Sequence, residues 1–233
     1  DHTGASDGKE GILSFWIKFS NGDGTFYRIA EGGTSVNFFV QRTAGNLYDI
    51  GVTSTAGGAG KRFNSASQWN TSDGWHHVYA SWDATNVWLY INGVNDLGTT
   101  TNNVDTNLNY TQSDWIVGSG PSGTNKVPAG IADWYFNQAT FLDPTTASNI
   151  AKFISTKGAP VDLGSDGSTP TDTAPIEYFN QNALATWHTN AGGGGGFTES
   201  GALTAGNNQD LIGNSFADSG LAANDQVTDS PTD

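Results

Sequence analysis

The stretch GWHHVYASWDATNVWLYING, residues 74–93, decides the fold of this chain. Apolar side chains occupy every second position in both halves of the stretch, which is the period of β-strands that bury one face. The side chains expected to face the core are Val78, Ala80, Trp82, Val87, Leu89 and Ile91. Residues 83–86 form the expected turn, and Asn92 with Gly93 tolerates the positive φ of a second tight reversal. The pattern therefore predicts a β-hairpin followed at once by another reversal.

Four further segments on either side of the hairpin have the same strand-like character. They are residues 12–18, 26–30, 115–118 and 130–137. Their order, together with the hairpin, resembles the laminin-G-like branch of the concanavalin-A-like jelly rolls over residues 11–157. The resemblance implies an all-β fold, a two-sheet antiparallel jelly-roll sandwich. Ala132 departs from the usual pattern of the closing strand, although Asp133 is close to the position of the family's acidic residue.

Three segments outside these strands also carry local signals. Residues 35–41 and 47–53 are predicted to form a further hairpin. Residues 97–107 are rich in Thr and Asn and show no periodicity, so they are expected to be a loop. A short helix is predicted over 144–156 with Asp143 as its N-cap, and we expect it to cap one open end of the sandwich.

The C-terminal part of the chain has the least regular pattern. Residues 175–188 are predicted to contribute a strand, and the Gly-rich tract 192–196 resembles the loop after the family's first strand. Either the chain returns to add the strand that relatives supply from their N-terminus, or this part is a linker. The predicted organisation is a loose segment 1–10, a jelly roll over 11–205, and an extended arm or linker over 206–233. The arm resembles inter-domain stretches of bacteriophage virion proteins.

The composition fits a loop-rich sandwich with a substantial core. The 233 residues include 31 Gly and 7 Pro for turns and 8 Trp to fill the interior. No Cys is present, so stability rests on packing and the redox compartment cannot be inferred. No run of 18 apolar residues and no leader are visible, so neither a membrane-spanning helix nor a signal peptide is expected. A chain without Met that starts at Asp1 is expected to be processed or part of a longer polypeptide.

The net charge of −14 limits the choice of partners. Nucleic acids and anionic membranes attract cationic proteins, and only 9 Lys and Arg residues are present, so neither partner is expected. Neutral glycans, cations and basic proteins stay open. All acidic residues are Asp except Glu10, Glu31, Glu177 and Glu199. Asp suits turns and can also ligate calcium.

No recognisable catalytic motif is present. Glucanases of the concanavalin-A-like fold place carboxylates on one strand as Glu-x-Asp-x-x-Glu, and none of the four Glu residues has that spacing. A pair of Asp residues from distant strands stays open. There is neither Cys nor a Gly-x-Ser-x-Gly motif. The adjacent His76 and His77 point to opposite faces of their strand, so they cannot jointly hold zinc. The chain is therefore predicted not to be an enzyme.

Calcium is the one metal that the loops suit, and no other cofactor is expected. Asp23, in an Asn-Gly-Asp-Gly loop, and Asp96, which follows Asn95, offer oxygen ligands, but neither loop has the regular spacing of an EF-hand. Ordinary turn formation explains the same residues, so both interpretations stay open.

An aromatic surface is the best indication of a binding site. By the alternation of the hairpin, Tyr79, Trp88 and Tyr90 share the face opposite the core, and Trp16 lies on the non-core face of its own strand. Exposed aromatic rings bind sugars by stacking on their apolar faces. The alternative is that the C-terminal segment or a neighbouring subunit covers this face.

Together these observations favour a non-catalytic carbohydrate-binding or adhesive module of a bacteriophage virion, as tail fibre, spike or capsid decoration. Its expected partners are a glycan or cell-surface polysaccharide and other virion subunits, and its expected location is the virion or the extracellular space. Two alternatives stay open. One is a purely structural virion subunit whose aromatic face is a protein interface, and the other is an unrecognised glycoside hydrolase.

Overall fold

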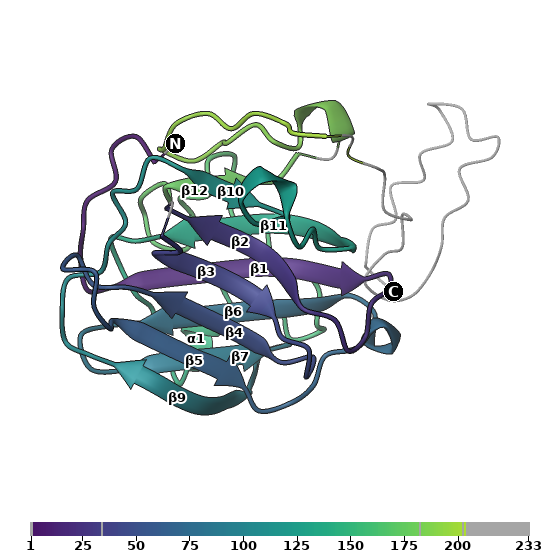
Figure 1. Ribbon diagram of the computed structural model, residues 1–233, viewed down its shortest axis with the longest axis horizontal. Coiled ribbons are helices and arrows are strands. Elements are labelled where there is room, and N and C mark those ends of the chain that lie inside the picture. Colours follow the sequence, from purple (N-terminus) through teal and green to yellow (C-terminus); the bar gives the residue numbers. More distant parts are fainter. Residues whose placement is uncertain (1, 34, 182, 202, 204–233) are drawn as a thin grey trace.

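The computed structural model describes residues 2–33, 35–181, 183–201 and 203, which form two antiparallel six-stranded sheets packed face to face (Figure 1). The first sheet has the order β12 (Glu177–Phe179), β11 (Ala129–Asn137), β1 (Gly11–Phe19), β6 (His76–Trp82), β7 (Val87–Ile91) and β8 (Val94–Asn95). The second sheet has the order β10 (Trp115–Val117), β2 (Tyr27–Gly32), β3 (Phe38–Arg42), β4 (Tyr48–Val52), β5 (Lys61–Ser65) and β9 (Leu97–Asn103). The predicted all-β jelly-roll sandwich is confirmed.

The central hairpin has the predicted register and the predicted core face. In β6 and β7, Val78 pairs with Ile91, Ala80 with Leu89 and Trp82 with Val87. All six side chains are buried between the sheets. Trp82 is fully buried, and its indole Nε1 donates a hydrogen bond to the Tyr110 hydroxyl across 2.7 Å. The local alternation of apolar residues was sufficient to predict the core face of the hairpin, because the second sheet covers this face along its whole length.

The hairpin predicted over 35–41 and 47–53 is confirmed as β3 and β4. The loop predicted over 97–107 is wrong for its first part, because β9 spans Leu97–Asn103 and pairs with β5. Most of β9 is exposed, so no apolar alternation marks it, although its β-branched Thr residues suit an extended backbone. A strand at a sheet edge therefore escaped a search for hydrophobic period.

The N-terminal segment is packed against the sandwich, which corrects the expectation of a loose segment. The His2 ring stacks on Trp115 with 3.5 Å between ring centroids. Asp7 Oδ1 accepts hydrogen bonds from the backbone N–H groups of Tyr110 and Thr111 at 2.9 and 3.0 Å. Polar residues at a terminus can be ordered when their side chains satisfy buried or loop backbone groups.

The helix predicted over 144–156 is much shorter in the structure. Only α1 (Ala147–Ile150) is helical, and Thr146 rather than Asp143 is its N-cap residue. The Asp143 carboxylate instead accepts a hydrogen bond from the Thr145 backbone N–H at 2.8 Å, which forms a turn. The other short helical segments are 3-10 turns at Thr71–Asp73, Pro121–Gly123 and Leu184–Thr186. Among the described residues, no helix is long and apolar enough to cross a membrane.

The segment 141–163, which contains α1, covers the outer face of the first sheet rather than an open end of the sandwich. Phe153 contacts Tyr79 and Tyr135 with ring centroids 5.2 and 5.3 Å apart. These rings belong to a second buried cluster, separate from the core between the sheets. In Figure 1, α1 lies behind β6 and β7. The two central strands of the first sheet, β1 and β6, therefore bury both of their faces.

The C-terminal part returns to add a strand at the edge of the first sheet, as one of the two interpretations proposed. The strand is β12, which pairs with β11 and is shorter than the predicted 175–188. Residues 190–198, called the C-terminal strap below, run along the outer edge of β12. Within the strap, the N–H groups of Gly193 and Gly194 donate to the carbonyls of Pro175 and Ile176 at 2.8 and 3.1 Å. The arm predicted over 206–233 lies outside the described residues.

Candidate functional site

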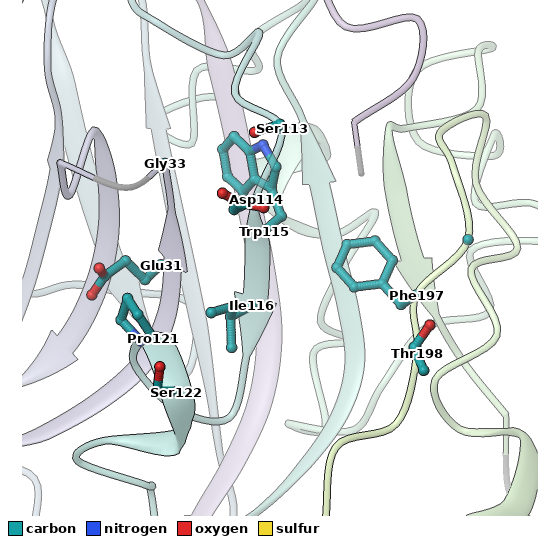
Figure 2. A pocket seen from close by; sticks show the side chains of 11 residues that line it. Glu31, Gly33, Ser113, Asp114, Trp115, Ile116, Pro121, Ser122, Phe197 and Thr198 are labelled. Atoms are coloured by element: carbon teal, nitrogen blue, oxygen red, sulfur yellow. The ribbon is translucent and has the colours of Figure 1, made fainter.

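A cleft of about 430 Å³ opens between β10 and the C-terminal strap (Figure 2). Its central lining residues are Glu31, Asp114, Trp115, Ile116, Phe197 and Thr198. Figure 2 shows Phe197 and Thr198 on the strap side and Ile116 on the opposite side. These residues lie up to 167 positions apart in the sequence, so no local pattern could have pointed to the cleft.

Glu31 is a buried carboxylate on the wall formed by β2. It pairs with Ile116 of β10 in the sheet register, and it is 3% exposed. Its Oε2 accepts a charged hydrogen bond from Arg28 Nε at 2.9 Å. Burial raises the pKa of Glu31, while the Arg28 guanidinium opposes that rise. Glu31 is thus held in one orientation at the border of the cleft.

Trp115 gives the cleft a rigid aromatic floor. Its ring is 7% exposed, stacks on His2, and donates from Nε1 to the Gln112 carbonyl at 2.9 Å. Behind it, both oxygens of the buried Glu177 carboxylate are bound, one to His2 Nε2 and one to Trp134 Nε1, each at 2.6 Å. This buried network fixes the N-terminus, β12 and the floor of the cleft together. Sequence reasoning missed it because its members are spread over the whole chain.

Phe197 forms the opposite wall, and the Gly-rich tract explains its position. The ring packs edge-on against Phe179 of β12, with 4.9 Å between centroids. A Cβ atom at Gly194 would lie 2.4 Å from the Ile176 carbonyl oxygen, so only glycine allows the strap to run this close to β12. Without that close approach, Phe197 would not reach the cleft.

The lining combines hydrogen-bonding groups with rings, and none of the described residues that form it has a cationic side chain. Glu31 and Asp114 supply carboxylates, and Ser113, Ser122 and Thr198 supply hydroxyls. Carboxylates accept hydrogen bonds from several hydroxyls at once, and aromatic rings pack on the apolar faces of sugars. The cleft also has the size of small-molecule sites, about 300–1,000 Å³. Its chemistry suits a ligand rich in hydroxyl groups and without negative charge.

Two members of the predicted aromatic surface lie in the interior, which corrects the prediction of an exposed platform. Tyr79 is fully buried and its hydroxyl donates to the Leu142 carbonyl at 2.7 Å. Trp16 is 3% exposed and lies against the His77 ring, with 5.0 Å between centroids. The segment 141–163 covers Tyr79, and its apolar residues do not by themselves indicate which surface they pack against.

The other two members, Trp88 and Tyr90, are half-buried on β7. Trp88 stacks parallel to Phe141, with centroids 5.8 Å apart and planes 3° apart. Neither residue lines the cleft between β10 and the strap. A ligand-binding role for Trp88 and Tyr90 stays a prediction.

The two adjacent histidines point to opposite faces of β6, as expected, and both are fully buried. His76 Nδ1 donates to the Gly74 carbonyl at 3.0 Å, so Nε2 accepts from the Tyr48 hydroxyl at 2.5 Å. His77 Nε2 hydrogen-bonds with Ser14 Oγ at 2.8 Å. Burial lowers the pKa of His76 to about 4 and that of His77 to about 3. Both rings are therefore neutral structural groups.

The two weak calcium candidates support loops through hydrogen bonds. The Asp23 carboxylate accepts from the backbone N–H and the hydroxyl of Thr71, at 3.0 and 2.8 Å. Asp96 accepts from Trp69 Nε1 at 2.9 Å and from the Ser67 N–H at 3.0 Å. Within the part of the chain that the structure describes, no three His, Cys, Asp or Glu side chains are grouped to hold a metal ion. Calcium binding stays a prediction.

The chain is similar to several solved structures, of which three are described here. A candidate carbohydrate-binding protein from Bacteroides ovatus ATCC 8483 has a TM-score of 0.53 and 10% identity, over 76% of this chain and 46% of that chain. The binding domain of botulinum neurotoxin DC, in complex with SialylT, has a TM-score of 0.45 and 17% identity, over 61% and 35%. A heptameric SAP-like pentraxin from Limulus polyphemus has a TM-score of 0.41 and 16% identity, over 62% and 70%.

At these identities, the first likeness shows a shared fold, and this chain spans less than half of that protein. No curated protein sequence matches the chain. A family model supplies the assignment. Residues 7–140, more than half of the chain, match the model of the concanavalin A-like lectin/glucanases superfamily, and the chain belongs to that superfamily.

Proposed function

We propose that this chain is a non-catalytic carbohydrate-binding module and that the cleft between β10 and the C-terminal strap is its sugar site. The observation that carries the proposal is the lining of the cleft, which joins carboxylates and hydroxyls to aromatic rings. Membership of the lectin/glucanases superfamily supports a carbohydrate ligand.

The expected ligand is a neutral sugar or an amino sugar. Arg28 balances the charge of Glu31, whereas Asp114 is exposed and would repel a sialic acid or a sulfate, and the described lining residues include no Lys or Arg. The Phe197 ring offers a partly exposed apolar surface on which one sugar ring can pack. We therefore expect neutral glycans to be bound in preference to sialylated or sulfated glycans.

A glycan array followed by calorimetry tests the proposal. Phe197→Ala and Asp114→Ala should each weaken binding by about tenfold, because each removes one contact type at a binding site. Asp114 is exposed, so its removal should leave the fold intact. Trp88→Ala is the matched control, since it removes a half-buried ring outside the cleft. Loss of binding in the control alone would move the site to β7, and failure of the wild-type chain to bind any glycan would overturn the function.

The buried carboxylate also gives the hydrolase alternative its one supporting observation. A carboxyl with a raised pKa, such as Glu31, can act as a general acid. Retaining and inverting glycosidases both need a second carboxylate across the scissile bond, and Asp114 lines the same cleft. We propose binding without hydrolysis because Glu31 is engaged by Arg28. Reducing-end release from a bound polysaccharide that disappears in Glu31→Gln would overturn this.

We further propose that the module belongs to the surface of a bacteriophage virion, where it would meet cell-surface polysaccharide and other virion subunits. The support is the resemblance of the segment 206–233 to linkers of virion proteins. In the structural-subunit alternative, the half-buried Trp88 and Phe141 would contact a neighbouring subunit. Mass spectrometry of purified virions should detect peptides of this chain. Their absence would contradict the virion location and would leave only the extracellular role.

A further inference from the structure

Lys61 is a buried lysine whose amino group has no carboxylate partner. It is the first residue of β5 and is 2% exposed. Lysine is almost never buried unless an acidic group pairs with it. None of the described residues places a carboxylate oxygen within ion-pairing distance of Lys61 Nζ. Burial lowers the pKa of Lys61, while the carboxylates of Asp83 and Asp105 oppose that fall. A larger fraction of this amine is therefore neutral and nucleophilic than of an exposed lysine.

The amino group lies against the side-chain amide of Asn103, the last residue of β9. Lys61 and Asn103 are directly opposite each other where β5 pairs with β9. Nζ donates to Asn103 Oδ1 across 2.5 Å, so it lies next to the carbon atom Cγ that carries this oxygen. Nζ also donates to the Ala84 carbonyl at 3.0 Å, and Asn103 Nδ2 donates to the Thr85 carbonyl at 2.6 Å. Two neighbouring carbonyls therefore hold the two nitrogen atoms in place.

The turn that supplies these carbonyls is itself tightly bonded. It joins β6 to β7 over residues 83–86, and the Asp83 N–H donates to the Asn86 carbonyl at 3.1 Å. Asp83 Oδ1 accepts from the N–H groups of Thr85 and Asn86, each at 2.7 Å. Two groups that are fixed side by side react as if their concentration were far above that in solution. The turn of the first sheet thus preorganises a contact within the second sheet.

We propose that Lys61 and Asn103 form an isopeptide bond, which the folded chain makes by itself. After a rotation of the Asn103 amide about its Cβ–Cγ bond, the neutral Nζ attacks Cγ. The Nζ–Cγ bond forms and the Cγ–Nδ2 bond breaks, and one proton passes from Nζ to Nδ2, so that ammonia leaves. Atoms and charges balance without an oxidant or a cofactor. Asn103 is exposed, so the released ammonia has a path to solvent.

The bond would tie the edge strand β9 covalently to β5. The pairing of these strands is irregular, with register shifts between Arg62 and Phe63 and between Phe63 and Ser65. The chain has no Cys, so a disulfide cannot provide such a link. A covalent link between residues 42 positions apart restricts the unfolded chain, as a disulfide does. The bond forms independently of any ligand in the cleft.

Mass spectrometry of the complete 233-residue chain under denaturing conditions tests the proposal. We expect an intact mass that is lower than the sequence mass by one ammonia. After proteolysis, a branched peptide should join Lys61 to Asn103. Lys61→Arg and Asn103→Ala should each show the full mass of their own sequence and unfold at a lower urea concentration than the wild type. Thr100→Ala is the matched control, because it changes an exposed residue of the same strand and should keep the loss of ammonia.

The wild-type chain alone can overturn the proposal, whether or not the variants fold. A wild-type chain with the full sequence mass does so, and so does a loss of ammonia without the branched peptide. Cyclisation of Asn92 onto Gly93 would also release ammonia, but it does not need Lys61. A loss of ammonia that persists in Lys61→Arg therefore contradicts the isopeptide bond as well.

Discussion

Both faces of β6 are buried, whereas the outer face of β7 is only half-buried, and different parts of the molecule cover the two faces of this hairpin. The inner face, with Trp82 at its centre, is covered by the second sheet. The outer face, with Tyr79, is covered by the segment 141–163, which places Phe153 on it. One of two adjacent histidines lies on each face. Burial lowers the pKa of both, to about 4 for His76 on the inner face and to about 3 for His77 on the outer face.

The difference between the two faces shows which structural features the alternation of side chains along a strand can predict. A period of two residues separates two faces of a strand, but it does not state whether the second face meets water. An aromatic residue on the second face, such as Tyr79, has the same pattern whether it binds a ligand or packs under a loop. Four measurements sharpen or break the comparison of the two faces.

The largest effect is expected from Trp82→Ala on the inner face. The substitution leaves a cavity in the core between the sheets, which costs about 3–5 kcal/mol of the free energy of unfolding. It also removes the donor to the Tyr110 hydroxyl. Urea unfolding followed by circular dichroism measures the loss. An unchanged midpoint would contradict the assignment of Trp82 to the core.

Phe153→Ala should show that the outer face is a second core. Phe153 is 2% exposed and touches both Tyr79 and Tyr135, so its removal should cost about 3 kcal/mol. The same urea titration measures it, and Thr145→Ala, at an exposed position of the same segment, is the control. A loss below about 0.5 kcal/mol, the usual value for surface positions, would mean that the segment 141–163 only rests on the sheet.

The pH dependence of stability should report both faces at once. Each histidine has a lower pKa in the folded chain than its ordinary value, so the unfolded chain binds more protons as the pH falls below about 6.5. Stability is therefore complete above that pH and decreases on acidification, towards pH 4 for His76 and pH 3 for His77. Between pH 6.5 and 5 the loss should be about 2 kcal/mol for each histidine.

Replacing one ring at a time separates the two contributions. His76→Phe should remove the inner share of the pH dependence, and His77→Phe the outer share. NMR titration of the ring protons offers an independent check, because neither ring should titrate above pH 5 in the folded chain. A histidine that titrates near pH 6.5 would show that its face of the hairpin is open to water.

The smallest effect is expected from Trp88→Ala, at the border where the outer cover ends. Trp88 is half-buried and stacked on Phe141, and such a pair contributes about 1 kcal/mol. The cost should therefore lie well below that of Phe153→Ala in the same unfolding experiment. A cost as large as that of Trp82→Ala would extend the second core to the end of β7.

Much of the fold was predictable because its signals are local. The central hairpin and β3–β4 were found from alternation and turn residues, which act over a few positions of the chain. β9 was missed because an exposed edge strand needs no apolar face. The helix was overestimated because the turn at Asp143 competes with helical hydrogen bonds.

The candidate site was not predictable in the same way. Glu31, Asp114 and Phe197 carry no shared spacing, and they meet only because β10 pairs with β2 and the strap returns along β12. The Gly-rich tract was visible, but its role depends on the carbonyl groups that it passes.

The sequence by itself determined the class of fold, the core face of the central hairpin and the acidic character of the chain. The hydrophobic period and the turn residues act over a few neighbouring positions, and the charge is a sum over all residues. Only the tertiary structure decided that Tyr79 and Trp16 are covered, that the N-terminus is anchored through His2, and where the cleft lies. Those features depend on contacts between distant segments. Such contacts form when the whole chain has packed, because each distant segment must bury its own apolar surface against the others.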